Sequence, residues 1–314
     1  MRKRRTKISK STARKLKRML KTNNSAETEL LTSIIDSLEK QGIAQELTEA
    51  KSPQDIDKTL KKISFKNLAA WFKRLGRKIL KRNREGFQKV TEALTQGVEQ
   101  TGAELTKEEK KQLKFKKAVN SLAKEEKYFQ PMLDKFYHNL SLIKNLPEDL
   151  GEKLKEAYFK GEGLRGSDVE ELFTERMKSR ARLIIRTESS KINSALTEVR
   201  AKSTGLNAYT WLTSEDIKVR ASHKLVDGVL FFWDDPPTLD KMTGHAGEFP
   251  NCRCISVPIF EIDDITFPVK VAEHLVAIGK YDKSTKKDRA IITGGRIQTY
   301  SKQEFIAKYG NKFN

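Results

Sequence analysis

Hydrophobic residues recur at helical spacing through the first half of the chain. Between residues 27 and 39 this spacing is made by Leu30, Leu31, Ile34, Ile35 and Leu38. A second apolar stripe runs through residues 65–79, and similar patterns continue over residues 107–129 and 133–142. No alternation of period two, which would indicate strands, occurs before about residue 160. We therefore predict that residues 23–160 form a helical domain.

Glycine marks the next boundary. Gly161, Gly163 and Gly166 lie within six residues, which predicts a linker at 161–167. Ser167 and Glu170 then make a capping-box pattern, so a helix is expected to begin at Asp168. Its apolar stripe continues to residue 199, and a glycine at position 205 is placed to end it. The pattern indicates a single long helix.

Beyond residue 205 the apolar period changes to about two. Residues 209–212, 229–233 and 255–260 are candidate strands, and Asp227-Gly228 predicts a tight turn before the second of them. We predict an α+β protein: a mainly helical N-terminal region, then a small α+β domain at residues 168–260 with one long helix and a short antiparallel sheet. Residues 261–314 form a C-terminal extension, with a hairpin that turns at 293–295 and a short helix started by a Ser301–Glu304 capping box.

One carboxylate interrupts the apolar stripe of the long helix. Glu188 falls between Ile185 and Ile192. A buried charge without a partner costs several kcal/mol, so Glu188 needs either a cation or access to water. A partner from elsewhere in the domain, Arg220 or His223, is one solution, and a half-covered helix is the other. The sequence leaves both open.

Chemically versatile side chains gather between residues 209 and 258. Three interpretations compete. His223, His245, Cys252 and Cys254 supply two imidazoles and two thiols, a combination that suits tetrahedral zinc, although Cys-x-Cys is tighter than common zinc spacings. In an extended strand the two cysteines would point to opposite sides.

The second interpretation is a catalytic site made of Arg186, Glu188 and His223. The chain has no phosphate-binding loop, nucleophile elbow or zinc-protease helix to support it.

We favour the third interpretation, a polar core that fixes the packing of a small domain. Asp216 and Arg220 have the spacing of an ion pair on a helical turn. The predicted core consists of Arg186, Glu188, Trp211, Asp216, Arg220, His223, Asp227, Gly228, Asn251 and Arg253. In this interpretation the protein is not an enzyme and needs no cofactor, and zinc remains an alternative.

The charge of the chain points to a polyanionic partner. The net charge is +20 over 314 residues. Residues 1–22 contain no acid and predict a disordered arm that contacts phosphates without reading sequence. Its cations include Arg2, Lys3, Arg4, Arg5, Lys7, Arg14, Lys15, Lys17 and Arg18. No apolar run is long enough for a membrane span. Two cysteines give no disulfide framework, which favours the cytoplasm.

The ordered motifs of the second half resemble a known family. Arg186-Thr187-Glu188 on a helix, Trp211, Asp-x-x-x-Arg-x-x-His, Asp-Gly and Cys-Arg-Cys follow one another as in the Mu F-like head-morphogenesis proteins of tailed bacteriophages. The resemblance covers roughly residues 168–260. Two departures are visible: Lys218 stands where an arginine is common, and residues 238–249 take a longer path to the cysteines.

The resemblance implies a minor capsid protein inside the virion, assembled in the host cytoplasm. Its implied partners are the portal protein and packaged double-stranded DNA, with the major capsid or scaffolding protein as further candidates, and its implied roles are head assembly and DNA delivery. The alternatives are a nucleic-acid-acting enzyme or a toxin module built on a zinc or Arg/Glu site.

Overall fold

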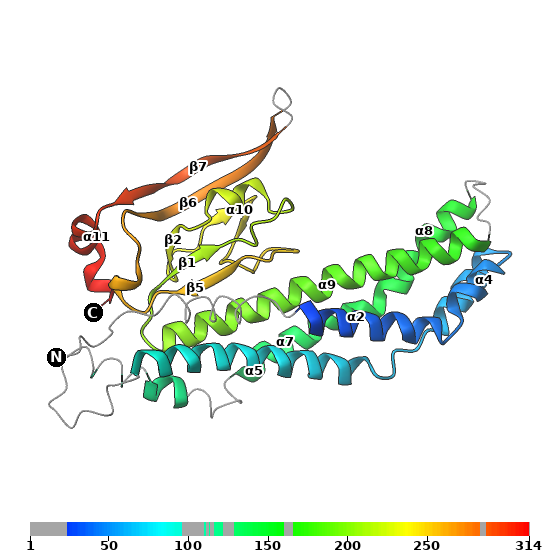
Figure 1. Ribbon diagram of the computed structural model, residues 1–314. Helices are drawn as coiled ribbons and strands as arrows, with labels where there is room; N and C mark the ends of the chain where they lie inside the picture. Colours follow the sequence, from blue (N-terminus) through cyan, green and yellow to red (C-terminus); the bar gives the residue numbers. More distant parts are fainter. Residues whose placement is uncertain are drawn as a thin grey trace. The chain divides into compact units, whose positions relative to one another are not determined.

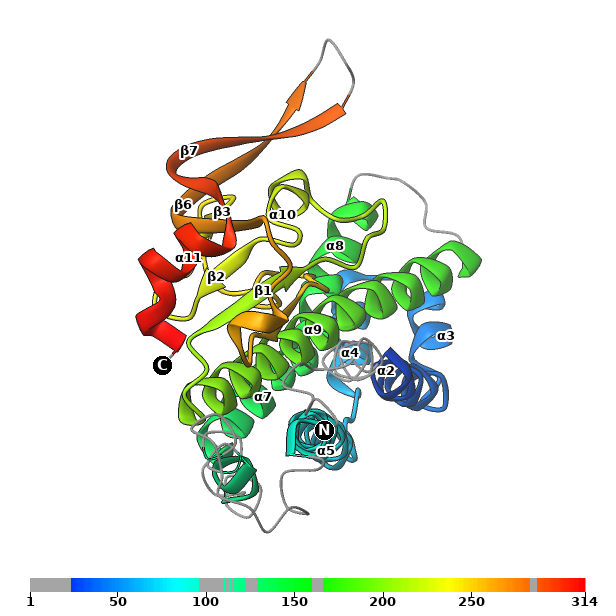
Figure 2. The same cartoon turned by 60° about the vertical axis from the view of Figure 1, so that its left-hand side comes forward.

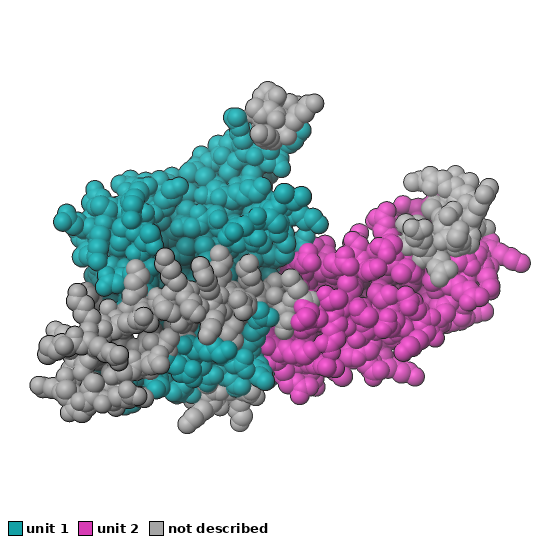
Figure 3. Space-filling view, in the orientation of Figure 1, with its two compact units in different colours: residues 1–22, 80–130, 190–314 teal, residues 23–79, 131–189 magenta. Residues whose placement is uncertain are grey.

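The chain divides into two compact units. The computed structural model describes residues 24–95, 110, 113, 116–121, 129–159, 166–282 and 287–313. One unit comprises residues 23–79 and 131–189, and the other comprises residues 1–22, 80–130 and 190–314 (Figure 3). The predicted basic arm, residues 161–165 of the predicted linker and most of the helix expected at 107–129 lie outside the described residues.

The first unit is helical. It contains α2 (Asn24–Glu39), α3 (Ile43–Thr48), α4 (Pro53–Lys61), η2 (Leu142–Asn145), α8 (Leu146–Phe159), most of α7 (Gln130–Ser141) and the first parts of α5 (Leu68–Thr95) and α9 (Gly166–Ser203) (Figure 1). The predicted stripe of α2 is buried at Leu30, Ile34 and Leu38. Helix α4 packs against α8, where Leu60 lies over Gly151. Over its described residues, the region predicted to be helical therefore consists of helices joined by short turns and loops.

The long helix α9 begins at Gly166, two residues before the predicted start, and ends at Ser203. Its predicted apolar stripe is buried, as at Met177, Ile185 and Leu196. Gly205 follows in the left-handed conformation, with φ of 80°, which is the geometry that favours glycine after a helix.

The second unit is built around a seven-stranded mixed sheet. Its strands are β1 (Ala208–Leu212), β2 (Leu230–Phe232), β3 (Thr238–Leu239), β4 (Met242–Thr243), β5 (Ile255–Pro258), β6 (Val269–Asp282) and β7 (Lys287–Tyr300). Strand β1 pairs antiparallel with both β2 and β5, so that Tyr209 lies opposite Phe231 and Pro258. These are the three strands predicted from the period of two. The short helix α10 (Ala221–Leu225) lies between β1 and β2 in the chain.

The prediction of a short antiparallel sheet is wrong in size and in pairing. Strand β6 runs parallel to β2, with Leu230 opposite Val271, and parallel to β3, with Thr238 opposite Val276. The sheet order is β4-β3-β6-β2-β1-β5, and β7 pairs antiparallel with β6. Strand β6 is not evident from the sequence, because a register shift between Glu273 and Val276 interrupts the alternation of apolar and polar residues that is typical of a strand. Residues beyond 260 thus supply an internal strand of the same sheet.

The C-terminal hairpin reverses at a different place from the one predicted. Residues 293–295 do not turn the chain but lie inside β7, where Gly295, with φ of 62°, forms part of the irregularity opposite Glu273 and Val276. The reversal lies between the two fourteen-residue strands β6 and β7, which extend beyond the other strands (Figure 1). The short helix is confirmed as α11 (Lys302–Tyr309), with a Ser301–Glu304 capping box, and the chain continues after it as η4 (Gly310–Phe313).

The two faces of the sheet bury different clusters, as the period of two requires. One cluster gathers Tyr209, Trp211 and Phe231 with Phe87 of α5. The other gathers Leu230, Phe232 and Val271 with Phe305 of α11, which lies beside the sheet in Figure 2. No helix within the described ranges is both long enough and apolar enough to cross a membrane.

Candidate functional site

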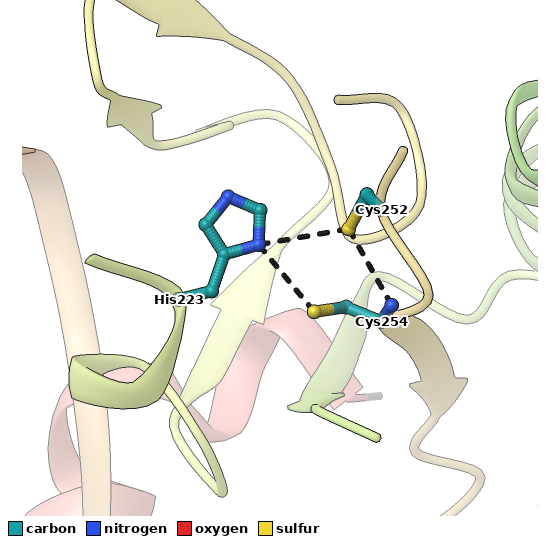
Figure 4. A group of neighbouring side chains, drawn as sticks. All are labelled: His223, Cys252 and Cys254. Atoms are coloured by element: carbon teal, nitrogen blue, oxygen red, sulfur yellow. Dashed lines mark hydrogen bonds between the residues drawn. The ribbon is translucent and has the colours of Figure 1, made fainter. Parts of the chain in front are cut away.

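The structure gathers one imidazole and two thiols into a buried cluster. His223 comes from α10, and Cys252 and Cys254 come from the loop before β5. The Nδ1 atom of His223 lies 3.4 Å from Sγ of Cys254 and 3.5 Å from Sγ of Cys252 (Figure 4). The side chains are only 2%, 4% and 5% exposed, in the order of the sequence. Both cysteines are free thiols.

The loop conformation turns both thiols to the same side. The expectation that an extended Cys-x-Cys would separate them is wrong, because the segment is a tight loop that starts at Asn251 with φ of 53°. The amide of Cys252 donates to the carbonyl of Phe249 at 3.1 Å, and the amide of Cys254 donates back to Sγ of Cys252 at 3.4 Å. The hydroxyl of Ser190, on α9, stabilises the loop by donating a hydrogen bond to the Cys252 carbonyl at 2.7 Å.

The two thiols have opposite proton affinities. A hydrogen bond from Cys254 to the Cys252 thiolate lowers the pKa of Cys252, and the neighbouring His223 lowers it further. The same hydrogen bond raises the pKa of Cys254, and burial raises it as well. The pair therefore favours one thiolate, held by an imidazole, a thiol and a backbone amide. Such a thiolate is a potential metal ligand or nucleophile.

Aromatic rings surround the cluster. The rings of Trp211 and Phe249 meet the His223 ring edge-on, with centroids 5.5 and 4.8 Å away. Both aromatic side chains are buried, Trp211 completely. The cluster is thus enclosed by apolar groups, which strengthens electrostatic interactions inside it.

His245 does not join the thiols. Its Nδ1 atom lies 3.0 Å from the Tyr209 hydroxyl, and its Nε2 atom lies 3.9 Å from a carboxylate oxygen of Glu198. The Trp233 ring packs edge-on against it. Desolvation lowers the pKa of His245, while Glu248 and Glu198 partly oppose this. The structure therefore brings together three of the four predicted metal ligands and places the fourth in a separate buried cluster.

The predicted Asp216–Arg220 ion pair is wrong. Asp216 pairs with Arg253, whose Nη2 atom lies 2.7 Å from its Oδ1 atom, and this hydrogen bond lowers the pKa of Asp216 to about 2. Arg220 donates instead to the carbonyl of Pro250 at 2.6 Å. The helical spacing failed because Arg220 is the extended N-cap of α10, with ψ of 149°, so it does not share a helix with Asp216. Both arginines nevertheless anchor the segment that leads to the cysteines.

Asp227 and Gly228 form the predicted turn after α10. The Asp227 carboxylate accepts from the Thr213 amide at 2.7 Å, and the Gly228 amide donates to the Trp211 carbonyl at 2.8 Å. Gly228 has φ of 73°, a conformation that favours glycine. This turn fixes the end of β1 that carries Trp211.

Arg186 and Glu188 belong to the helical unit. Glu188 accepts a hydrogen bond from Asn139 of α7 at 2.6 Å, whereas the partners predicted for it, Arg220 and His223, bind the Pro250 carbonyl and the thiols. Glu188 is buried, so the alternative of a carboxylate that reaches water does not hold either. The sequence could not identify Asn139, because it lies 49 positions away on another helix.

A second buried polar group, on α5 and α9, has no signal in the sequence. Asn83 of α5 accepts from Nε of Arg200 at 2.9 Å and donates to the Thr197 hydroxyl at 2.9 Å. Arg200 is 2% exposed and lies over the Phe129 ring, 4.4 Å from its centroid. Burial lowers the pKa of Arg200 to about 10. A lone asparagine in an amphipathic helix gives no signal of such a contact.

Comparison with known proteins finds a family that matches the region around the cluster. The family described as Phage Mu protein F like protein matches residues 148–257. Residues 148–257 are thus similar to the Mu F-like family. At the level of the family, this similarity points to phage head morphogenesis and to the virion. The Mu F-like region includes His223, Cys252 and Cys254 and ends within β5.

A curated relative shares part of the chain. An uncharacterized protein of Haemophilus influenzae is 34% identical over 129 residues, which cover 39% of this chain and 28% of the relative. The chain thus spans little more than a quarter of that relative's length. No solved structure matches the chain.

Proposed function

We propose that this protein is a minor head protein of a tailed bacteriophage, which lies inside the head, associates with the portal and contacts packaged double-stranded DNA. The observation that carries the proposal is the Mu F-like match over residues 148–257. The proposed roles are head assembly and DNA delivery.

The charge of the chain supports the proposed contact with DNA. A net charge of +20 attracts a polyanion, and residues 1–22 concentrate cations without any acid. Phosphate contacts of this kind carry no sequence information, so the binding should be independent of base sequence. They also release counterions, which makes the affinity depend steeply on salt.

We propose further that the role is structural and not catalytic. His223, Cys252 and Cys254 could in principle serve a thiol enzyme, but all three are buried beside Trp211 and Phe249. A substrate would reach them only after local unfolding. The other polar pairs, such as Asp216 with Arg253, hold loops together.

A gel-shift titration tests the DNA contact. We expect the full chain to bind duplexes of unrelated sequence equally, with an affinity that falls roughly a thousandfold or more between about 50 and 200 mM salt. A chain that lacks residues 1–22 should bind more weakly and show a shallower salt dependence. Absence of binding at the lower salt concentration would remove DNA from the proposal.

Co-purification tests the association with the portal. The tagged chain and the portal protein of the same phage, expressed together, should elute as one complex after nuclease treatment. A matched preparation with the major capsid protein in place of the portal serves as the control. If only the control complex forms, the proposed partner is incorrect.

A further inference from the structure

The three buried ligand atoms of the His-Cys-Cys cluster already have the spacing of a metal site. A zinc ion bound at about 2.3 Å from sulfur and about 2.0–2.1 Å from nitrogen, with tetrahedral angles, places nitrogen about 3.6 Å from each sulfur. The Nδ1 atom of His223 lies 3.4 and 3.5 Å from the two sulfurs, and all three atoms lie within 4.8 Å of one another. Little movement is therefore needed to coordinate an ion.

The surroundings also suit metal-bound thiolates. The backbone amide of Cys254 points at Sγ of Cys252 at 3.4 Å, a contact that stabilises negative charge on sulfur. Figure 4 shows the imidazole and both sulfurs directed at one another from two separate segments of the chain. Two thiols and an imidazole lie together among buried aromatic rings. An ion would give these three polar groups a common partner.

We propose that His223, Cys252 and Cys254 bind one Zn²⁺ ion, which fixes α10 to the loop before β5. Thiolate and imidazole ligands select zinc over hard cations such as Mg²⁺ or Ca²⁺. The ion would close loops across 29 and 31 positions of sequence, between His223 and each cysteine. Metal binding of this kind adds directly to folding stability. The inference does not depend on the proposed role in the phage head.

A tetrahedral zinc ion needs a fourth ligand, which we assign to a water molecule enclosed with the ion. Among the described residues, the cluster holds three potential ligands, and His245 lies outside it, hydrogen-bonded to Tyr209. Three protein ligands and a position open to substrate are the arrangement of catalytic zinc sites. Because the cluster is buried, we assign the ion a structural role.

Metal analysis of the full chain tests the proposal. Protein purified without chelators from zinc-supplemented cells should contain about one zinc per chain. Cys252→Ser, Cys254→Ser and His223→Ala should each reduce the zinc affinity by about tenfold or more, whereas His245→Gln provides a matched control with a buried histidine outside the cluster and should retain the ion. Removal of zinc with a chelator should lower the melting temperature and expose both thiols to a thiol reagent.

A spectroscopic measurement keeps the test decisive if a variant fails to fold. Cobalt(II) added to the metal-free wild-type chain should give the visible absorption of a tetrahedral site and sulfur-to-metal charge-transfer bands. Metal-free protein whose thiols react equally with and without zinc, or a chain that gives no cobalt spectrum, would overturn the proposal. Loss of zinc in His245→Gln but not in His223→Ala would do the same.

Discussion

Gly295 shows how one residue can determine the path of a strand. It lies within β7 with φ of 62°, and a Cβ atom there would overlap the carbonyl oxygens of Glu273 and His274 on β6. Glycine is therefore needed twice, for its backbone conformation and for the close approach of the neighbouring strand. In the sequence alone, the dipeptide Gly294-Gly295 is typical of a turn.

Gly295→Ala should lower the free energy of unfolding more than an ordinary substitution of a left-handed glycine. Gly205→Ala is the matched control, because Gly205 has φ of 80° and a Cβ atom there would meet no other atom within 4 Å. We expect the control to cost roughly 1–2 kcal/mol. Gly295→Ala should exceed it by roughly 1–3 kcal/mol, since backbone atoms must move. Denaturant unfolding measures both, and equal losses would mean that the close approach is absent.

The sequence indicates which residues make up the site, but not which of them contact one another. His223, Cys252, Cys254 and Trp211 were identified because such side chains are rarely gathered in one window. The partners depended on loop conformation, which spacing does not encode. The spacing in the sequence predicts Arg220 as the partner of Asp216, but the extended backbone at Arg220 removes it from that position, and Arg253 forms the pair.

At the scale of elements, Glu273 joins β6, β7 and α11. Its carboxylate accepts from Arg296 and Tyr300, each at 2.8 Å, and from Lys308 and Tyr309 of α11. Partial burial alone would raise the pKa of Glu273, but these hydrogen bonds lower it well below its usual value. The charged form is therefore the one that the folded state prefers.

This preference predicts a dependence of stability on pH. Because the pKa of Glu273 is lower in the folded chain than the value of about 4.3 in an unfolded one, its contribution is complete above that value and is lost as the pH falls below it. Glu273→Gln should cost about 1–3 kcal/mol at pH 7 and show less loss of stability on acidification. Denaturant unfolding at neutral and acidic pH checks this.

Glu92→Gln, at an exposed position of α5, is the control for that measurement. It should leave both the stability and its pH dependence close to those of the wild type. If Glu273→Gln were to behave like this control, the carboxylate would not hold α11 in solution.

Elements with a regular pattern were predicted, and elements that depend on distant pairing were not. The stripe of α9 and the alternation in β1 identify both from local sequence alone. Strand β6 has an interrupted alternation and is defined by its parallel partners β2 and β3, which lie about 40 positions away. The capping box of α11 is a purely local signal, and it is correct.

For the molecule as a whole, the second unit includes residues beyond 260, because β6 and β7 belong to its sheet. The predicted boundary at residue 260 falls between β5 and β6, although β6 pairs with β2 and β3. The Mu F-like match ends at residue 257, so the matched region alone lacks this strand. The cluster that buries Leu230 and Phe232 also uses Val271 and Phe305.

A chain that stops at residue 260 should therefore fail to form a cooperative second unit. The contribution of Trp211 and Trp233 to the near-ultraviolet circular dichroism should be lost, and the exposed apolar face should bind a hydrophobic dye. Removal of residues 1–22 instead should leave the spectrum and the cooperative transition intact. An unchanged spectrum in the chain that stops at 260 would contradict the role assigned to β6.

The parallel pairing of β6 also orders events during synthesis. The ribosome releases β1 and β2 well before β6, so the nascent sheet carries an unpaired edge at β2 while the remaining residues are made. Translation must pass residue 282, the end of β6, before that edge is covered. Until then the unpaired edge of β2 is exposed, and a strand of another copy could pair with it. A pause in translation at this stage would therefore favour aggregation over assembly.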